Sequence, residues 1–266
     1  MKVAILAGGL GTRLREETEF KPKPMVEVGG RPILWHIMQG YAAHGVTDFV
    51  VCLGYKGHVI RDYFVNYHTR NCDLTISLGS NETTLHNKHN ELDWRVTLAE
   101  TGDKTQTGAR LKRILKYIDG NQFMATYGDG VSDVDVDELL ESHRRSGKLA
   151  TVTAVRPSSR FGELLLDNGL VSTFYEKPQV SNSWVNGGFF VFEKEAFDLI
   201  ERDEDTLERD LLIRLAERGE LSVYQHNGFW QCMDTLRESE LLNKMWESGD
   251  APWMKAGTRR ALATAK

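Results

Sequence analysis

The sequence predicts an α/β fold, with a mixed, mostly parallel sheet that carries helices on both faces. Short apolar runs alternate with helix-like stretches over the first half of the chain. The first apolar run, residues 3–6, leads straight into a glycine-rich turn that contains Gly8, Gly9 and Gly11. A chain of 266 residues, 41% of them hydrophobic, can also bury the sizeable core that such a sheet needs.

In the first half, apolar runs typical of buried strands are separated by stretches with helical spacing. The expected strands are residues 3–6, 48–53, 74–78, 95–98 and 123–127, and the expected helices are 32–44, 58–67 and 110–118. Pro32 is favoured in a first helical turn, and apolar residues between Ile33 and Tyr41 recur at helical spacing. The polar run 79–93 is expected to be a solvated excursion or an arm that contacts another subunit.

The second half is richer in strand-like runs. The expected strands are residues 151–155, 164–167, 170–176, 189–192 and 221–226, and the expected helices are 194–200 and 207–218. Asn168-Gly169 is a typical two-residue turn and should join two of these strands as a hairpin. An aromatic strand, residues 229–231, and a helix over 235–247 complete the ordered part.

Composition and charge exclude several classes of protein. A net charge of −5 and a pI near 5.9 argue against a nucleic-acid partner, because proteins that bind phosphate backbones are usually basic. No window approaches the roughly 18 apolar residues of a membrane span, so no membrane partner is expected. The three cysteines are scattered without metal or disulfide spacing, and the expected compartment is the cytoplasm.

The glycine turn and the cations beside it predict a site for a nucleoside triphosphate. Glycines directly after a strand let the backbone approach a ligand and offer N–H groups to an anion. Arg13 and Lys23 add two positive charges close to this turn in the sequence. A phosphate-binding P-loop is excluded because Thr12-Arg13 follows Gly11, and a dinucleotide fingerprint is disfavoured because Leu14 stands at its third glycine position. A simple tight turn is the alternative for the glycines alone.

Asp129 is the best candidate for a metal ligand. It follows the apolar strand 123–127 and lies between Gly128 and Gly130, which would expose its carboxylate at the carboxyl edge of a sheet. Mg²⁺ prefers one or two carboxylates together with phosphate oxygens and water. The alternative for Asp129 is a turn-forming aspartate. A second carboxylate could come from Asp234, which follows the aromatic strand 229–231, but for that residue the local alternative is the N-cap of the helix 235–247.

Several motifs resemble the sugar-phosphate nucleotidylyltransferase family. They are Leu-Ala-Gly-Gly-Leu-Gly-Thr-Arg-Leu at 6–14, Lys-Pro-Lys-Pro-Met at 21–25, Ile-Leu-Trp-His-Ile-Met at 33–38, Leu-Gly-Tyr-Lys-Gly at 53–57, Thr-Tyr-Gly-Asp-Gly at 126–130, Asn-Gly-Gly-Phe-Phe at 186–190, Phe-Trp-Gln at 229–231 and Met-Asp-Thr at 233–235. The first two are typical of the whole family. The Trp-His-Ile-Met and Gly-Tyr-Lys-Gly strings are similar to its glucose-1-phosphate cytidylyltransferase branch, and the resemblance covers about residues 1–253.

The resemblance implies a nucleotide-diphospho-sugar transferase fold in a single domain, 1–253, followed by a tail, 254–266. Residues 1–150 would bind the nucleotide, and residues 151–253 would bind the sugar phosphate. The implied reaction is Mg²⁺-dependent transfer of the cytidylyl group of CTP to α-D-glucose 1-phosphate, which gives CDP-glucose for bacterial surface polysaccharide such as O-antigen. Members of the branch are homo-oligomers, often hexamers. Two alternatives stay open: the same chemistry with UTP, dTTP or another sugar 1-phosphate, and a catalytically silent nucleotide-sugar-binding regulator.

The resemblance also assigns roles to individual residues. Arg13 would meet the triphosphate and the leaving pyrophosphate, Lys23 would steady the α-phosphate, and Asp234 would join Asp129 at the metal. The implied nucleotide-binding residues are Leu6, Ala7, Gly8, Gly9, Gly11, Thr12, Thr107, Gly108 and Arg110. The implied sugar-phosphate residues are Gly162, Glu176, Lys177 and Asn186.

Overall fold

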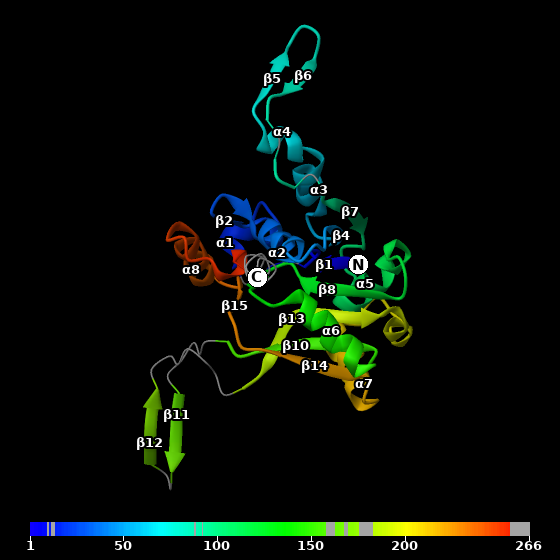
Figure 1. Ribbon diagram of the computed structural model, residues 1–266, viewed down its shortest axis with the longest axis vertical. Helices are drawn as coiled ribbons and strands as arrows, with labels where there is room; N and C mark the ends of the chain where they lie inside the picture. The colour runs from blue at the N-terminus through cyan, green and yellow to red at the C-terminus, as the bar shows by residue number, and fades with distance from the viewer. Residues whose placement is uncertain are drawn as a thin grey trace, which may run out of the picture.

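The computed structural model describes residues 1–9, 11, 14–87, 89–91, 93–157, 163–167, 170–175 and 183–255. Its centre is a seven-stranded sheet with the strand order β14-β10-β13-β8-β1-β4-β7 (Figure 1). The strands are β1 Lys2–Leu6, β4 Asp48–Leu53, β7 Arg95–Glu100, β8 Gln122–Tyr127, β10 Ala150–Val155, β13 Val185–Glu193 and β14 Leu221–His226. Only β13 runs antiparallel to its neighbours in this sheet, so the predicted mixed, mostly parallel α/β fold is confirmed.

Alternate side chains of the central strands enter two separate cores. In β1, Val3 and Ile5 face one core, and Ala4 and Leu6 face the other. This alternation follows from the two-residue period of a strand, and all four residues are apolar because both faces are covered.

Helices cover each face of the sheet. The first core contains apolar residues of α2 Ile33–Ala42, α3 Gly57–Val65, α6 Val136–Ser146 and α8 Leu236–Glu247. The second contains those of α5 Thr107–Ile114, the 3₁₀ helix η4 Lys194–Leu199, the π-helix η5 Leu207–Leu212 and α7 Ile213–Glu217. None of the helices within the described ranges is both long enough and apolar enough to cross a membrane.

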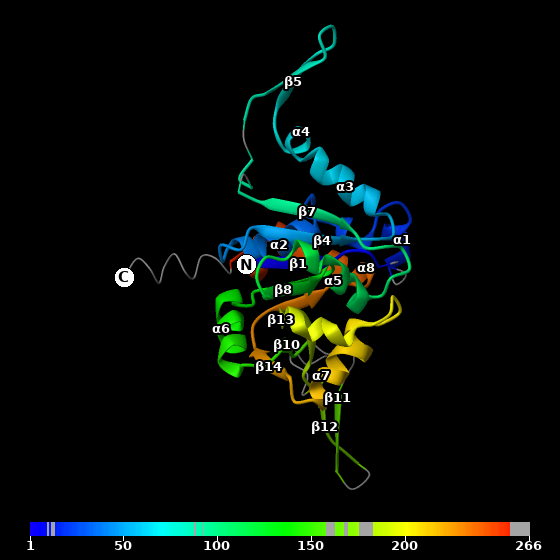
Figure 2. The same ribbon diagram turned by 90° about the vertical axis from the view of Figure 1, so that its right-hand side faces the viewer.

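Two hairpins lie outside the central sheet. The strands β5 Leu74–Ser77 and β6 Glu82–Leu85 pair with each other beyond the short helix α4 Tyr67–Asn71, and β11 Glu163–Asp167 pairs with β12 Leu170–Tyr175. Both views place these hairpins at opposite ends of the long axis (Figures 1 and 2). The predicted strand 74–78 therefore does not join the main sheet, and the polar run 79–93 contains a strand of its own. β11 and β12 pair antiparallel, as predicted for these two strands, and the predicted turn residues Asn168-Gly169 lie outside the described ranges.

Several predicted boundaries were wrong for local reasons. The helix over 58–67 is interrupted at Asn66, which lacks helical ψ, and the helix predicted from 110 begins at Thr107. The helix predicted over 194–200 is a 3₁₀ helix, Lys194–Leu199, and the helix predicted over 207–218 begins as the π-helix Leu207–Leu212 before the α-helix Ile213–Glu217. The strands β2 Glu27–Val28, β3 Arg31–Pro32 and β9 Gly130–Ser132 are too short for periodicity to reveal, whereas β15 Trp230–Cys232, which pairs with β9, overlaps the aromatic strand predicted at 229–231.

His36 belongs to the first core and is held as a neutral ring. Its Nε2 lies 2.8 Å from the carbonyl oxygen of Val28, and its Nδ1 accepts a hydrogen bond of 3.2 Å from Trp253 Nε1. Burial lowers the pKa of His36 to about 4. These contacts give His36 a structural role in the packing of α2.

The His36 environment predicts a loss of stability in mild acid. Because the folded-state pKa lies below the unfolded value near 6.5, the unfolded chain binds more protons between pH 6.5 and 4, and stability falls as the pH drops through this window. The full contribution is about 3 kcal/mol. Urea unfolding of the wild type and of His36→Gln at pH 7 and pH 5 should show a smaller pH-dependent loss in the variant. Equal losses in the two proteins would contradict this assignment.

Candidate active site

The glycine turn lies at the carboxyl edge of the sheet, in close contact with a buried arginine. A Cβ atom on Gly8 would lie 2.3 Å from Arg110 Nη1, so only glycine fits here. Gly11 has φ +62°, a conformation that side chains other than glycine's rarely adopt. Leu6 ends β1, Ala7 donates to the carbonyl oxygen of Cys52, and Gly9 is exposed. The described residues of the turn thus have the close packing at Gly8 and the positive φ at Gly11 that glycine allows, and the binding of a phosphate there stays a prediction.

Lys23 lies beside this turn and bridges two aspartates. Its Nζ is 2.7 Å from Asp129 Oδ2 and also bonds Asp234 Oδ1. Burial by itself lowers the pKa of Lys23, but the charge of Asp129 and the hydrogen bonds to both aspartates outweigh it, so the pKa is raised. The lysine is therefore charged at neutral pH. Lys23–Met25 form a buried 3₁₀ turn.

Close packing around Gly128 places Asp129. A Cβ on Gly128 would lie 2.8 Å from the carbonyl oxygen of Leu6 and 2.9 Å from Pro24 Cγ. The absence of a side chain thus lets the end of β8 approach both β1 and the turn that carries Lys23. The Asp129 carbonyl accepts a hydrogen bond of 2.8 Å from the Met233 N–H, which ties it to the segment that carries Asp234.

Pairing of two short strands brings Asp234 to the same place. β15 is antiparallel to β9, with Cys232 opposite Gly130, so the residues that follow β15 meet those that precede β9. Thr235, not Asp234, is the N-cap of α8 and forms a capping box with Glu238. The N-cap alternative for Asp234 is therefore wrong, and its carboxylate contacts Lys23.

A cavity of about 280 Å³ opens next to the two aspartates. Its lining comes from four strands, the β8–β9 turn, the segment after β15 and the π-helix η5, and comprises Thr126, Tyr127, Asp129, Gly130, Asn186, Gly187, Phe189, Glu208, Trp230, Cys232 and Asp234. Asn186 thus shares one cavity with both predicted metal ligands. Its Nδ2 donates to the Tyr127 hydroxyl at 3.3 Å, and its Oδ1 accepts from the Gly188 N–H at 2.8 Å.

Thr107, Gly108 and Arg110, which the family resemblance assigns to nucleotide binding, lie in the first turn of α5. Gly108 packs against the backbone of Asp205 and Thr206 with no room for a Cβ, and the Thr107 hydroxyl bonds Glu208 and the Leu207 N–H. These contacts join α5 to the π-helix.

Arg110 supports the glycine turn from behind. Its guanidinium donates to the carbonyl oxygens of Leu53, Gly8 and Asp103 and to Thr101 Oγ1, over 2.8–3.3 Å. The arginine is buried, so these bonds fix the position of the turn relative to β4.

Five predicted site residues, Thr12, Arg13, Gly162, Glu176 and Lys177, lie outside the described ranges. Conversely, sequence reasoning missed Tyr127 and Glu208, which hydrogen-bond to each other within the cavity. Tyr127 stands inside the Thr-Tyr-Gly-Asp-Gly motif, so its neighbours could have drawn attention to it. Glu208 carries no such signal.

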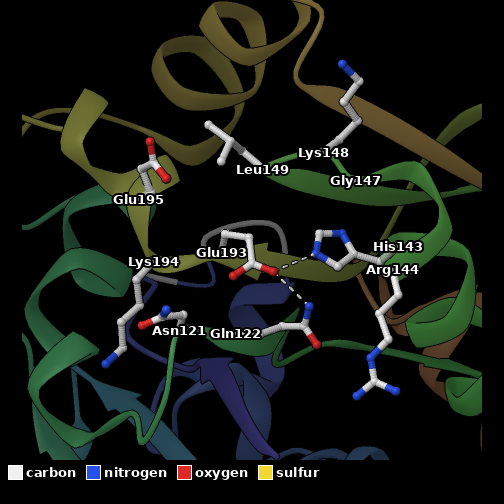
Figure 3. A pocket seen from close by; sticks show the side chains of 10 residues that line it. All are labelled: Asn121, Gln122, His143, Arg144, Gly147, Lys148, Leu149, Glu193, Lys194 and Glu195. Atoms are coloured by element: carbon white, nitrogen blue, oxygen red, sulfur yellow. Dashed lines mark hydrogen bonds and ion pairs between the residues drawn. The ribbon is translucent and has the colours of Figure 1, made fainter.

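A second cavity, of about 580 Å³, lies at the opposite edge of the sheet, where β8 and β10 begin (Figure 3). Glu193 occupies its centre and accepts from Gln122 at 2.8 Å and lies 3.4 Å from His143 Nε2. The cationic side chains of Arg144, Lys148 and Lys194 point away from one another in the close-up, so they do not converge on one anion. We regard this cavity as a packing feature beneath α6.

His44, Asp135 and Asp137 form another group with metal-ligand atoms within 4.8 Å of one another. His44 Nδ1 lies 3.1 Å from Asp137 Oδ2, and Asp135 caps α6 by accepting from the Glu138 N–H. These contacts join the end of α2 to the start of α6, which accounts for the group without an ion.

The geometry at the carboxyl edge suits transfer between two phosphate-bearing substrates. The end of β1 with Gly8 and Gly9, a charged lysine, two converging carboxylates and an adjacent cavity lie together where open α/β sheets bind ligands. Both reacting groups in such a transfer are anionic, so positioning and charge neutralisation are the main catalytic needs.

Comparisons with known proteins agree with this chemistry. Residues 2–266 match the nucleotidyl transferase family model. The chain is 51% identical over 254 residues to glucose-1-phosphate cytidylyltransferases of Salmonella typhi and Salmonella typhimurium, which covers 95% of this chain and 98% of each relative. The crystal structure of HddC from Yersinia pseudotuberculosis has the same fold, with a TM-score of 0.69 at 23% identity, covering 92% of this chain and 99% of that one. The chain belongs to the nucleotidyl transferase family.

Proposed function

We propose that the protein transfers the cytidylyl group of CTP to α-D-glucose 1-phosphate and releases CDP-glucose and pyrophosphate. An oxygen of the sugar phosphate attacks the α-phosphorus of CTP and forms a new P–O bond. The bond from that phosphorus to the bridging oxygen breaks, and its electron pair leaves with pyrophosphate. The 51% identity to cytidylyltransferases over almost the whole chain supports this pair of substrates.

The single structural observation that carries the proposal is Lys23, held between Asp129 and Asp234, which both line the cavity that contains Asn186. A fixed positive charge at this position can stabilise the charge that builds on the α-phosphate during transfer. Because Asp129 and Asp234 both bind the Lys23 ammonium, the ammonium needs little reorganisation as the reaction proceeds.

Asp129 and Asp234 also fit a Mg²⁺ ion. Both carboxylates lie within hydrogen-bonding distance of the same ammonium, so they already converge on one cation. Mg²⁺ typically takes one or two protein carboxylates and completes its shell with phosphate oxygens and water. When bound there, it would neutralise charge on the phosphates of CTP.

The remaining assignments rest on the family resemblance. Arg13 would face the triphosphate and the leaving pyrophosphate, and Thr12 would contact the nucleotide. Gly162, Glu176 and Lys177 would hold glucose 1-phosphate together with Asn186. Because β8 and β13 of the two chain halves pair in one sheet, we treat 1–253 as a single catalytic domain.

The protein is also proposed to act as a homo-oligomer, as large as a hexamer, in the cytoplasm, where CTP is available. The arm formed by β5 and β6 supports subunit contact, because Leu78 at its tip is 91% exposed and Ile76 is 51% exposed. Exposed apolar side chains on a projecting hairpin are typical of protein–protein contact sites.

The proposed function predicts a preference for CTP. A pyrophosphate-release panel of CTP, UTP, dTTP and GTP against several sugar 1-phosphates should give the highest kcat/KM with CTP and glucose 1-phosphate. A reaction without the sugar phosphate serves as the control for simple hydrolysis. A higher kcat/KM with UTP or dTTP would overturn the cytidylyl assignment, and no turnover with any pair would favour the regulator alternative.

A further inference from the structure

Glu208 connects the two sides of the active site through both of its carboxylate oxygens. Oε1 accepts the hydrogen bond of the Tyr127 hydroxyl, and Oε2 accepts that of Thr107 at 2.9 Å. Tyr127 in turn accepts from Asn186 Nδ2, inside the cavity beside Asp129. One carboxylate thus joins the start of α5 to the residue expected to hold the sugar.

The backbone conformation directs Glu208 toward this position. It is the second residue of the π-helix η5, which begins at Leu207, and a single π turn of this kind is uncommon and often found at functional sites. Thr206 caps the helix by accepting from the Arg209 N–H, and the Leu207 N–H bonds Thr107 at 2.8 Å. The first turn is therefore capped by Thr206 and joined to α5 through Thr107.

The charge of Glu208 sets the direction of each hydrogen bond in the chain. An ionised carboxylate only accepts, so the Tyr127 proton must point toward Glu208, and the Tyr127 lone pairs are left for the Asn186 amide. Burial, followed by the charge of Glu208, raises the pKa of Tyr127 above its usual range, so the phenol stays protonated. The Asn186 amide is consequently held in one orientation.

We propose that Glu208 is a positioning residue for the sugar phosphate: it orients Tyr127, which orients Asn186 in the cavity. This inference rests on the proposed function, because it assigns the cavity to glucose 1-phosphate. Glu208→Gln keeps the size of the side chain and can still accept from Thr107, but its amide N–H then faces the Tyr127 oxygen and competes with Asn186. The substitution should therefore weaken the binding of glucose 1-phosphate and leave the binding of CTP unchanged.

The test is steady-state kinetics of Glu208→Gln with each substrate varied in turn. We expect KM for glucose 1-phosphate to rise about tenfold, with kcat within about threefold of wild type and KM for CTP unchanged. Glu204→Gln, an exposed glutamate in the preceding turn, is the matched control and should behave as wild type. An unchanged KM for the sugar phosphate in Glu208→Gln would overturn the inference.

Tyr127→Phe and the double variant separate positioning from general stability. If Glu208 acts through Tyr127, the double variant should have the same KM for glucose 1-phosphate as Tyr127→Phe alone. If the two substitutions raised KM for glucose 1-phosphate additively, Glu208 would not act through Tyr127. A lower Tm of Glu208→Gln, with similar changes in kcat and in both KM values, would show that Glu208 has only a structural role. If the wild type makes no CDP-glucose, the proposed function fails. Calorimetric titration of glucose 1-phosphate into wild type and Glu208→Gln then still tests the inference, which requires Kd for the sugar phosphate to rise about tenfold in the variant.

Discussion

Asp129→Asn should lower kcat by about 10²-fold or more and leave the fold intact, because removing one preorganised charge-stabilising group typically costs this much. The variant keeps the shape of the side chain but loses the charge proposed to hold Mg²⁺ and shown to contact Lys23. Lys23 retains Asp234 as a partner, so no buried lysine is left without a counter-charge. Pyrophosphate-release kinetics over a Mg²⁺ titration, together with thermal unfolding, measure both effects.

The matched control for Asp129→Asn is Asp119→Asn, which removes one carboxylate charge from a side chain that is 87% exposed and pairs with Lys2 at the start of β1, at the opposite end of the strands from the site. Its kcat should equal that of the wild type. Near-normal turnover of Asp129→Asn at saturating Mg²⁺, with an unchanged Tm, would place the metal ligand elsewhere.

Lys23→Ala should act chiefly on kcat, with a loss of about 10²-fold, whereas Lys177→Ala should act chiefly on KM for glucose 1-phosphate. Lys23 is expected to stabilise charge that grows only as the α-phosphate is transferred. Lys177 is expected to hold a sugar phosphate that is already dianionic before the reaction. Interactions made only in the transition state lower kcat and kcat/KM together, while uniform binding contacts mainly raise KM. Kinetics with each substrate varied in turn measure the division.

An activity-independent measurement accompanies the Lys23 prediction. Without the ammonium, Asp129 and Asp234 repel each other, and a divalent cation should relieve that repulsion. The Tm of Lys23→Ala should therefore rise more on addition of Mg²⁺ than the Tm of wild type.

For Lys177→Ala the contradicting result is kinetic. If this variant raised KM for CTP and left KM for glucose 1-phosphate unchanged, the proposed division of the cleft would be wrong.

The local sequence was sufficient to predict the elements with strong periodicity and the candidate site residues that stand beside unusual neighbours. The alternation of apolar runs predicted the α/β class, and the run before Gly8 predicted the first strand, because burial on both faces leaves a continuous apolar signal. Asp129 was predicted as a metal ligand because glycines flank it at the end of a strand. In each case the physical cause lies within a few residues of the position itself.

The tertiary structure alone decided how these residues meet. Lys23 contacts aspartates 106 and 211 positions away, and this depends on the pairing of β9 with β15 and on the space left at Gly128. The antiparallel direction of β13 and the π-helix over 207–212 were likewise visible only in the folded chain.

The sequence by itself therefore determined the kind of chemistry this protein can perform, since glycines, a lysine and carboxylates after strands are local signals. Only the tertiary structure decided that Arg110 supports the glycine turn, that Thr235 rather than Asp234 caps α8, and that Glu208 reaches Tyr127. These contacts join segments remote along the chain. They exist because close packing and the need to satisfy buried polar groups select one arrangement among many that the local pattern permits.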